Sequence, residues 1–418
     1  MRGWRLPLLL SAAVLLAQLA RRSPLIDVVS GASPSDVHLA YPVWHFVFAP
    51  FTLLADWLNG GGTADLKGFG AWAVVAYVVA RLVATAPPRE RPRERSLPRE
   101  ALGAVVFAAG VAAFIAWVAY LPRPIPRLVA DDPDLLVFDV HSHTSTSHDG
   151  RRGFVAAANA AWHARAGFDA AFVTDHNRFG RLRSMGVPGR SSRLLNGEEL
   201  SLYGLHLIVL GNTREIDNHG YNASWDSTAA LIRHLSDSST LFSPQPSTPS
   251  SLQPPFLVAS LPEYWRNHWG ADLGDLVRWG VGGFEIWTTS PRAMDLTPDA
   301  RRSVIAQARF HRLTLFGATD MHGLGNTATV WNVARLPGWR AMSDSALTAA
   351  LLATFRARGA DANQVIALSR WMPSSRLGQA VAVPVNAALV LASASLPHAV
   401  ALVGWIWLVV LPLKRKKR

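Results

Sequence analysis

The chain has 418 residues, half of them hydrophobic, and a formal net charge of +12. A chain of this length and apolar content can bury at least one sizeable core, which excludes a wholly disordered protein. It contains no cysteine, which excludes thiolate metal sites and suits a domain exported to an oxidising space.

The first part of the chain, residues 1–122, has the composition of a membrane module. Its strongest candidate span is Ala101–Leu121, 21 residues without a charge, and Gly70–Ala86 is the second. Residues 4–20 begin with basic residues in the manner of a signal anchor, with a cleaved signal peptide as the alternative. Residues 41–57 contain prolines and polar residues, so they fit a re-entrant or interfacial segment as well as a span.

Much of the positive charge lies in two blocks, Arg89–Arg99 and Lys414–Arg418. Basic residues beside apolar spans usually record topology and contact with anionic lipid, so we favour a lipid bilayer over nucleic acid as the partner. If both blocks are cytoplasmic, the protein is a multi-pass protein of the cytoplasmic membrane with an extracytoplasmic central domain. Residues 380–418 then form a C-terminal anchor, which spans at Leu396–Leu413, although Pro397 also permits a hairpin of two short helices.

The region between these ends, residues 133–375, alternates strand and helix signals. A helix is expected at Gly153–Ala166. Strand-type runs are expected at Leu135–His141, Ala170–Thr174, Leu205–Leu210, Phe284–Trp287 and Leu313–Ala318. Such alternation predicts an α/β domain with a parallel sheet or barrel. The polar clusters follow the strand ends, where α/β barrels carry their chemistry.

The first of these clusters is Asp139-Val-His-Ser-His-Thr-Ser-Thr-Ser-His-Asp-Gly150. Side chains two residues apart on a strand point to the same face, so His141 and His143 can bind one cation together. His148 and Asp149 follow within a loop. The alternative is a polar surface loop that happens to contain three histidines.

Further histidines follow other predicted strands, which argues against a surface loop that contains histidines by chance. The histidines at or beside strand ends are His141, His143, His148, His176, His206 and His322. Imidazole and carboxylate groups together bind Zn, Mn or Fe without thiolate. The sequence therefore predicts a site for divalent metal ions.

The motifs, taken in order, resemble the PHP (polymerase and histidinol phosphatase) superfamily. They are Asp139-Val-His-Ser-His143, His148-Asp149-Gly150, Thr174-Asp175-His176-Asn177, Gly197-Glu198-Glu199-Leu200, His206-Leu-Ile-Val-Leu-Gly211, Gly283-Phe-Glu285 and Thr319-Asp320-Met-His322. The resemblance covers about 190 residues, nearly the whole central domain. It implies a distorted (β/α)7 barrel, flanked here by transmembrane helices, with two or three metal ions that hydrolyse phosphoesters.

The resemblance also implies a ligand set. The first metal would be held by His141, His143, Glu199 and Asp320; the second by Asp149, His176 and His322, with His148 as a rival for Asp149; the third by His206 and the shared Glu199. The third site normally gains a histidine where this chain has Leu261. Leucine cannot ligate, so that metal is weakly held, completed by Glu263 or His268, or absent.

These expectations define the predicted function. The protein would be a membrane-tethered metallohydrolase that cleaves a phosphomonoester or phosphodiester, with His148 and His176 at the reacting centre. His148, if it is not a ligand, can protonate the leaving oxygen. The main alternative, prompted by Leu261, is a domain that has lost turnover and serves as a metal- or ligand-binding sensor or scaffold. Hydrolysis of an amide is a third possibility.

Overall fold

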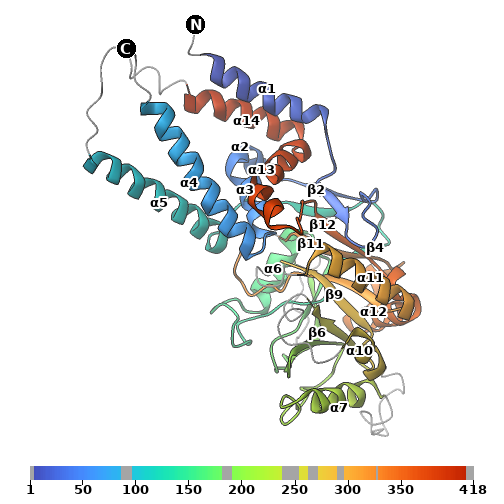
Figure 1. The fold of residues 1–418 in the computed structure, drawn as a ribbon. Coiled ribbons are helices and arrows are strands. Elements are labelled where there is room, and N and C mark those ends of the chain that lie inside the picture. The colour runs from blue at the N-terminus through green and yellow to red at the C-terminus, as the bar shows by residue number, and fades with distance from the viewer. Residues whose placement is uncertain are drawn as a thin grey trace, which may run out of the picture.

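The structure is a computed structural model that describes residues 4–85, 97–180, 191–237, 254–261, 272–289, 296–325 and 328–410. It combines a ten-stranded curled sheet, a two-stranded sheet and, within these residues, twelve α-helices (Figure 1). The predicted α/β class is confirmed.

The large sheet is mixed, not fully parallel. Its order is β1 (Leu25–Asp27), β12 (Gln364–Leu368), β11 (Val330–Arg335), β4 (Leu135–Asp139), β5 (Ala170–Val173), β6 (Arg193–Leu202), β7 (Leu205–Leu210), β8 (Phe256–Ser260), β9 (Gly283–Thr288) and β10 (Thr314–Ala318). Strands β4 to β6 and β8 to β10 are parallel neighbours, whereas β7 and β11 run antiparallel to both of their neighbours.

This sheet differs from the seven-stranded barrel that the resemblance implied. Among the described strands, β1 and β10 end the sheet and are not paired with each other. One cause is local: a tight turn at Tyr203-Gly204, with Gly204 at a positive φ of 65°, joins β6 and β7 as a hairpin. The strand that follows Glu199 therefore returns beside it instead of crossing over through a helix.

The curl of the sheet brings β10 back towards β4. Asn332 on β11 accepts a hydrogen bond from the Gly317 amide at 2.9 Å and donates to the Gly317 carbonyl at 2.7 Å and to the Phe138 carbonyl at 3.2 Å. Beyond the strand ends, Ser142 and Met321 form an isolated parallel bridge. The segments that follow β4 and β10, which carry His141 and Asp320, are therefore neighbours in space.

Five helices pack around the sheet, namely α6 (Ala156–Ala166), α7 (Trp225–Ser236), α10 (Leu273–Trp279), α11 (Pro298–His311) and α12 (Asp344–Arg358). Strands β4, β5, β8, β9 and β10 are buried at every position, because both of their faces are covered. Aromatic side chains, including Phe138, Phe316 and Phe355, fill one part of the core.

Gly167, which ends α6, is a position where a single methyl group should disturb this packing. Its φ is +96°, and a Cβ atom there would overlap the Leu128 carbonyl oxygen. We expect Gly167→Ala to lower the free energy of unfolding by more than about 1–3 kcal/mol, from backbone strain plus overlap. Thermal unfolding of the purified protein measures this. Gly338→Ala is the control, since Gly338 has φ +72° but open space around it. Equal losses of unfolding free energy in the two variants would show that the overlap with the Leu128 carbonyl is not destabilising.

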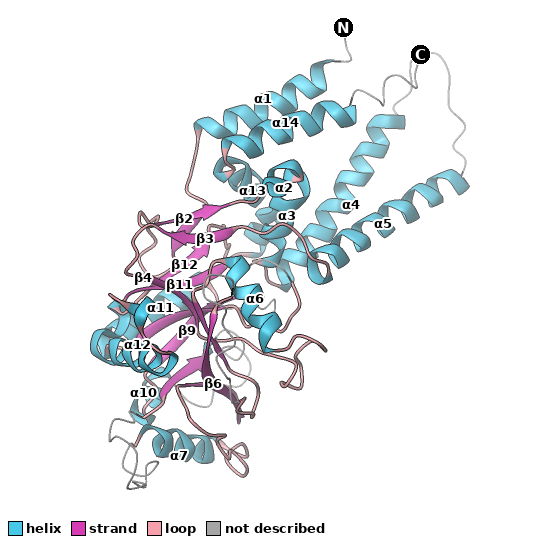
Figure 2. Cartoon of the chain, turned by 180° about the vertical axis from the view of Figure 1, so that it is seen from behind, coloured by secondary structure: helices cyan, strands magenta, loops and turns pink. Residues whose placement is uncertain are grey.

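The helical part contains α1 (Arg5–Leu19), α2 (Val43–Val47), α3 (Ala49–Asn59), α4 (Thr63–Thr85), α5 (Leu97–Tyr120), α13 (Arg376–Ser393) and α14 (Leu396–Val410). Helices α1 and α14 lie side by side, and α4 and α5 extend away from the large sheet (Figures 1 and 2). Residues 41–57, the doubtful span, form two short helices.

Two described helices are long and apolar enough to cross a membrane, Leu97–Tyr120 and Arg376–Ser393. Helices Arg5–Leu19 and Leu396–Val410 are apolar but shorter. The C-terminal apolar run is two helices, because the chain is extended at Ala394. The basic block Lys414–Arg418 and most of Arg89–Arg99 lie outside the described residues.

Two short strands of the N-terminal region belong with the central domain. Strand β1 pairs with β12, and β2 (Val37–Ala40) pairs with β3 (Arg127–Ala130) in the two-stranded sheet. A boundary at residue 122 therefore leaves two strands of these sheets, β1 and β2, on the N-terminal side with the helices. Runs of three or four residues carry too little periodicity to be recognised in the sequence.

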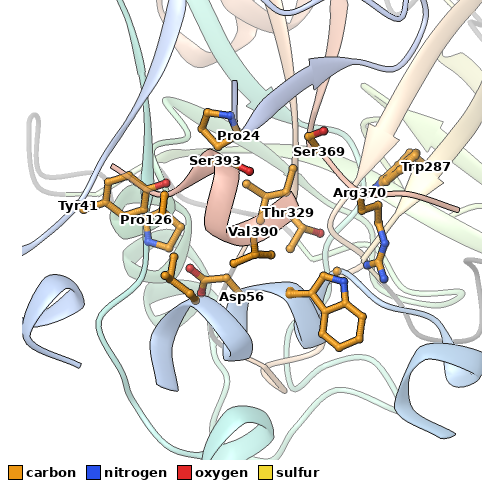
Figure 3. A pocket seen from close by; sticks show the side chains of 15 residues that line it. Pro24, Tyr41, Asp56, Pro126, Trp287, Thr329, Ser369, Arg370, Val390 and Ser393 are labelled. Carbon is orange, nitrogen blue, oxygen red and sulfur yellow. The ribbon is translucent and has the colours of Figure 1, made fainter. Parts of the chain in front are cut away.

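A buried polar network joins α2, α3 and α14 to the segment that follows α5. The Asp56 carboxylate lies 2.8 Å from His45 Nε2 and 2.6 Å from an Arg123 guanidinium nitrogen, and His45 Nδ1 lies 2.9 Å from His398 Nε2. Figure 3 shows the pocket beside this network, which Tyr41 and Asp56 line together with Trp287 of β9 and with Thr329, the residue before β11.

Candidate metal centre

The site begins at the end of β4. His141 and His143 are buried, and their Nε2 atoms lie 3.0 Å apart, so both imidazoles face one point as the spacing predicts. On the other side of His141, Nδ1 lies 3.3 Å from a carboxylate oxygen of Glu285, a buried residue of β9. Glu285 thus fixes the orientation of the ring and leaves Nε2 free for the site.

Glu199 occupies the middle of the site. It lies on β6, and its Oε2 atom is 3.1 Å from His141 Nε2, 3.2 Å from His143 Nε2 and 3.2 Å from His176 Nε2. Its Oε1 atom is 2.7 Å from His206 Nδ1 on β7. One buried carboxylate therefore contacts four imidazoles, the arrangement of a bridging ligand.

The segment after β10 supplies the next two groups. Asp320, held at a positive φ of 48°, places Oδ1 3.4 Å from His141 Nε2 and 3.3 Å from His143 Nε2. His322 stacks on His143 with ring centroids 4.1 Å apart. Its Nε2 atom is 2.9 Å from Asp149 Oδ2, which also lies 3.3 Å from His176 Nε2.

The side chains fall into three overlapping groups whose ligand atoms lie within 4.8 Å of one another. These are His141, His143 and Asp320; His143, Asp149, His176 and His322; and His176, Glu199 and His206. All eight residues expected as ligands are therefore brought together. His148 is exposed and outside these groups, with its ring centroid 4.9 Å from that of His176, so the geometry favours Asp149 over His148 as the ligand.

Nitrogen and oxygen donors at this density fit one or more divalent cations of the Zn, Mn or Fe type. Burial opposes a charge on His143, but hydrogen bonds with Asp320 and Glu199 outweigh it and raise its pKa to about 9. Burial likewise opposes ionisation of Glu199, but the charges of His141 and His206 hold its pKa well below the usual range. The Glu199 carboxylate thus stays ionised in the interior, as a carboxylate ligand must be.

A second layer of polar residues orients the first. Asp139 accepts a hydrogen bond from the Thr319 amide at 3.1 Å and lies 3.0 Å from His163 Nε2. Asp175 accepts from the Thr144 amide at 2.6 Å and from its hydroxyl at 2.7 Å. Sequence reasoning gave Glu285 and His163 no role. Glu285 belongs to one of the motifs that resemble the PHP superfamily, but only the fold shows that it contacts the His141 ring.

Two neighbouring positions lie outside the cluster. Glu198 points away from Glu199 and accepts hydrogen bonds from Asn212 at 3.0 Å and from the Ile216 amide at 3.1 Å. Burial raises its pKa to about 8. Leu261 is fully buried in the apolar core with Leu205 and its neighbours. Glu263 and His268, the possible substitutes for the missing ligand, lie outside the described residues.

The cluster opens into a cavity of about 480 Å³. Asp149, His176, Glu199, His206, Asp320 and His322 form its polar side. Its other side is apolar and comes from the helical part, with Leu58 of α3, Leu66 of α4 and Ile115 and Val118 of α5. The candidate metal centre therefore faces the helices.

Comparisons with known proteins add little. No family model matches the chain, and no curated protein matches it. Among solved structures, the chain is similar to PsfC from Pseudomonas syringae PB-5123, at 18% identity over 61% of this chain and 98% of that one, with a TM-score of 0.34. A TM-score this low establishes neither a shared fold nor a shared function.

Proposed function

We propose that the protein is a metal-dependent phosphoesterase of the PHP type, attached to a membrane through its helices. The observation that carries the proposal is the position of Glu199, whose carboxylate contacts His141, His143, His176 and His206. A shared carboxylate among imidazoles is the arrangement needed to hold metal ions close together. We also propose that the curled sheet is a distorted form of the (β/α)7 barrel.

Different residues of the site would have different roles in hydrolysis. Metal ions held by the three groups would supply Lewis-acid chemistry and make a water molecule more acidic. Hydrolysis bonds the water oxygen to phosphorus, breaks the bond to the leaving oxygen and delivers a proton to that oxygen. His148 is exposed beside His176 and can carry this proton. Asp139, Asp175 and Glu285 hold the ligands in position.

His148 gives the proposal a specific test. With Mn²⁺ or Zn²⁺, we expect the detergent-purified protein to hydrolyse members of a phosphoester panel and to lose this activity to a chelator. His148→Ala should lower kcat on alkyl phosphates by about 10²-fold or more, but lower it much less on nitrophenyl phosphate, whose leaving group needs no proton. Phosphate and nitrophenol release measure the two rates.

The matched control is His38→Ala, because His38 is an exposed histidine on β2, paired with Asp131. It should leave both rates unchanged. A panel with no chelator-sensitive turnover of any member would contradict the proposed activity, and equal losses on both substrates would remove His148 as the acid.

The second candidate is a metal- or ligand-binding sensor without turnover. Leu261 favours it, because this residue packs into the core where the resembling family has a histidine. Tight metal occupancy without hydrolysis would support the sensor. Activity gained by Leu261→His would identify a degenerate enzyme.

We also propose that the protein crosses the cytoplasmic membrane several times and carries its central domain outside. The support is the basic segment Arg89–Arg99 between two apolar segments. Because the chain lacks cysteine, Ser96→Cys and Ser345→Cys each create a single thiol. In intact cells, an impermeant maleimide should label Ser345→Cys, on the exposed surface of α12, and not Ser96→Cys. The reverse pattern would place the domain in the cytoplasm.

A further inference from the structure

One side of the cavity at the metal centre is formed by apolar residues of α3, α4 and α5, and α5 is long and apolar enough to cross a membrane. Ile115, Val118 and Ala119 of α5 line it together with Asp320 and His322. The same side of the cavity includes Leu58 and Leu66 from α3 and α4. A substrate that reaches the cluster therefore contacts both metal ligands and apolar helix surface.

Hydrogen bonds attach the metal-binding loop to the end of α5. The Gly325 amide donates to the Ala119 carbonyl at 2.6 Å, and the Arg151 guanidinium donates to the Tyr120 carbonyl at 3.4 Å and to the Gly323 carbonyl at 3.3 Å. Gly323 and Gly325 directly follow Asp320 and His322 in the chain. The cluster is thus fixed at the end of a helix long and apolar enough to cross a membrane.

From this end an apolar groove runs away between α4 and α5. Its volume is about 680 Å³, and its lining residues are Gly70, Ala73, Val74, Tyr77, Val78, Ala104, Phe107, Ala108, Val111, Ala112 and Ile115. Ile115 lines both the groove and the metal cavity. From Ala104 to Ile115 the helix rises about 16 Å, so the groove can hold an extended hydrocarbon chain along much of one leaflet.

We propose that the substrate is a lipid phosphoester, with its phosphate group in the cavity at the metal centre and its hydrocarbon chain in the groove between α4 and α5. This inference rests on the proposed phosphoesterase function. The groove adjoins the cavity at Ile115, which lines both, and this adjacency selects the occupant, because a helix or a second protein chain packed in the groove would have no reason to reach the metal cluster. A lipid phosphate has both parts, a phosphate for the cations and a chain for the apolar wall.

A side chain that fills the groove should lower kcat/KM for a long-chain substrate more than for a short-chain one. We compare kcat/KM for a long-chain alkyl phosphate with that for its short-chain, water-soluble analogue, in the full-length protein in detergent micelles. Ala112→Phe places a ring in the groove, displaces the chain and misplaces the phosphate. It should lower the ratio of long-chain to short-chain kcat/KM on the order of tenfold or more.

Ala113→Phe is the control. Ala113 is the neighbouring exposed alanine of the same helix and does not line the groove. It adds the same ring to the same helix but should leave the ratio unchanged. An unchanged ratio in Ala112→Phe, or equal changes in both variants, would overturn the proposal.

A binding measurement shows whether the groove holds a lipid phosphate even if no phosphoester is hydrolysed. A long-chain alkyl phosphate with a photoreactive group in its chain should cross-link to residues 104–115 in metal-loaded protein, and Ala112→Phe should reduce this labelling while Ala113→Phe does not. A neutral alcohol with the same chain is the comparison. Equal labelling by both lipids would indicate ordinary bilayer lipid and overturn the proposal, whereas phosphate-selective labelling without turnover would overturn only the phosphoesterase.

Discussion

Glu199→Gln should remove the metal ions from the site and with them the activity. Glu199 contacts four imidazoles, and its charge would balance the cations of the proposed metal centre. A neutral amide of the same shape cannot bridge two cations. Loss of an outer partner of a metal site typically costs about 10- to 100-fold in affinity, and loss of a bridging ligand should cost more. Elemental analysis after dialysis and the rate on the phosphoester panel measure the two effects.

Glu198→Gln provides the matched control, because it makes the same substitution one residue away. Glu198 is buried and points away from the cluster towards Asn212 and the Ile216 amide. Since burial raises its pKa to about 8, this side chain is mostly protonated at pH 7, and glutamine resembles that form. Metal content and rate should therefore stay near those of the natural protein. If Glu198→Gln abolished both and Glu199→Gln did not, the assignment of the bridging carboxylate would be wrong.

Asp56→Ala should cause the largest loss of stability among single substitutions away from the metal centre. The Asp56 carboxylate contacts Arg123 at 2.6 Å and His45 at 2.8 Å, and all three side chains are buried. Removal of one member of a buried ion pair leaves the other charge desolvated and typically costs about 3–5 kcal/mol. Thermal unfolding in detergent should show a clear fall in Tm.

The exposed pair between Arg81 and Glu100 supplies the comparison. It links α4 and α5, and both side chains are more than one-third exposed. Solvent screens such pairs, so Glu100→Gln should change Tm little. Similar shifts in the two variants would show that the buried network contributes no more than a surface contact.

The sequence was most informative where function depends on local spacing. His141 and His143 are two positions apart, as are Asp320 and His322, and in both pairs the side chains lie at the cluster. The family resemblance also implied Glu199, and the structure places Glu199 at the cluster and Glu198 outside it. The pair His141 and His143 could be inferred because a strand end fixes side-chain direction over two or three residues.

Relations between distant segments could not be inferred in the same way. The antiparallel course of β7 depends on a two-residue turn, and the contact between Glu285 and His141 depends on the curl of the whole sheet. The pairing of β1 with β12 joins residues more than 300 positions apart. Nor did composition alone indicate that α5 would line the metal cavity, since apolar residues that face lipid and those that face a cavity look the same.

The pairing of β1 with β12 has a practical consequence for anyone who wishes to work on a soluble fragment. A protein cut to residues 133–375 would lose Leu25–Asp27 and with it the partner of Leu368, Ala367 and Ile366. The backbone amides and carbonyls along that side of β12 would become available to other molecules, a common origin of strand-to-strand aggregation. Aggregation of such a fragment would then indicate a missing edge strand and not an inability of the central domain to fold.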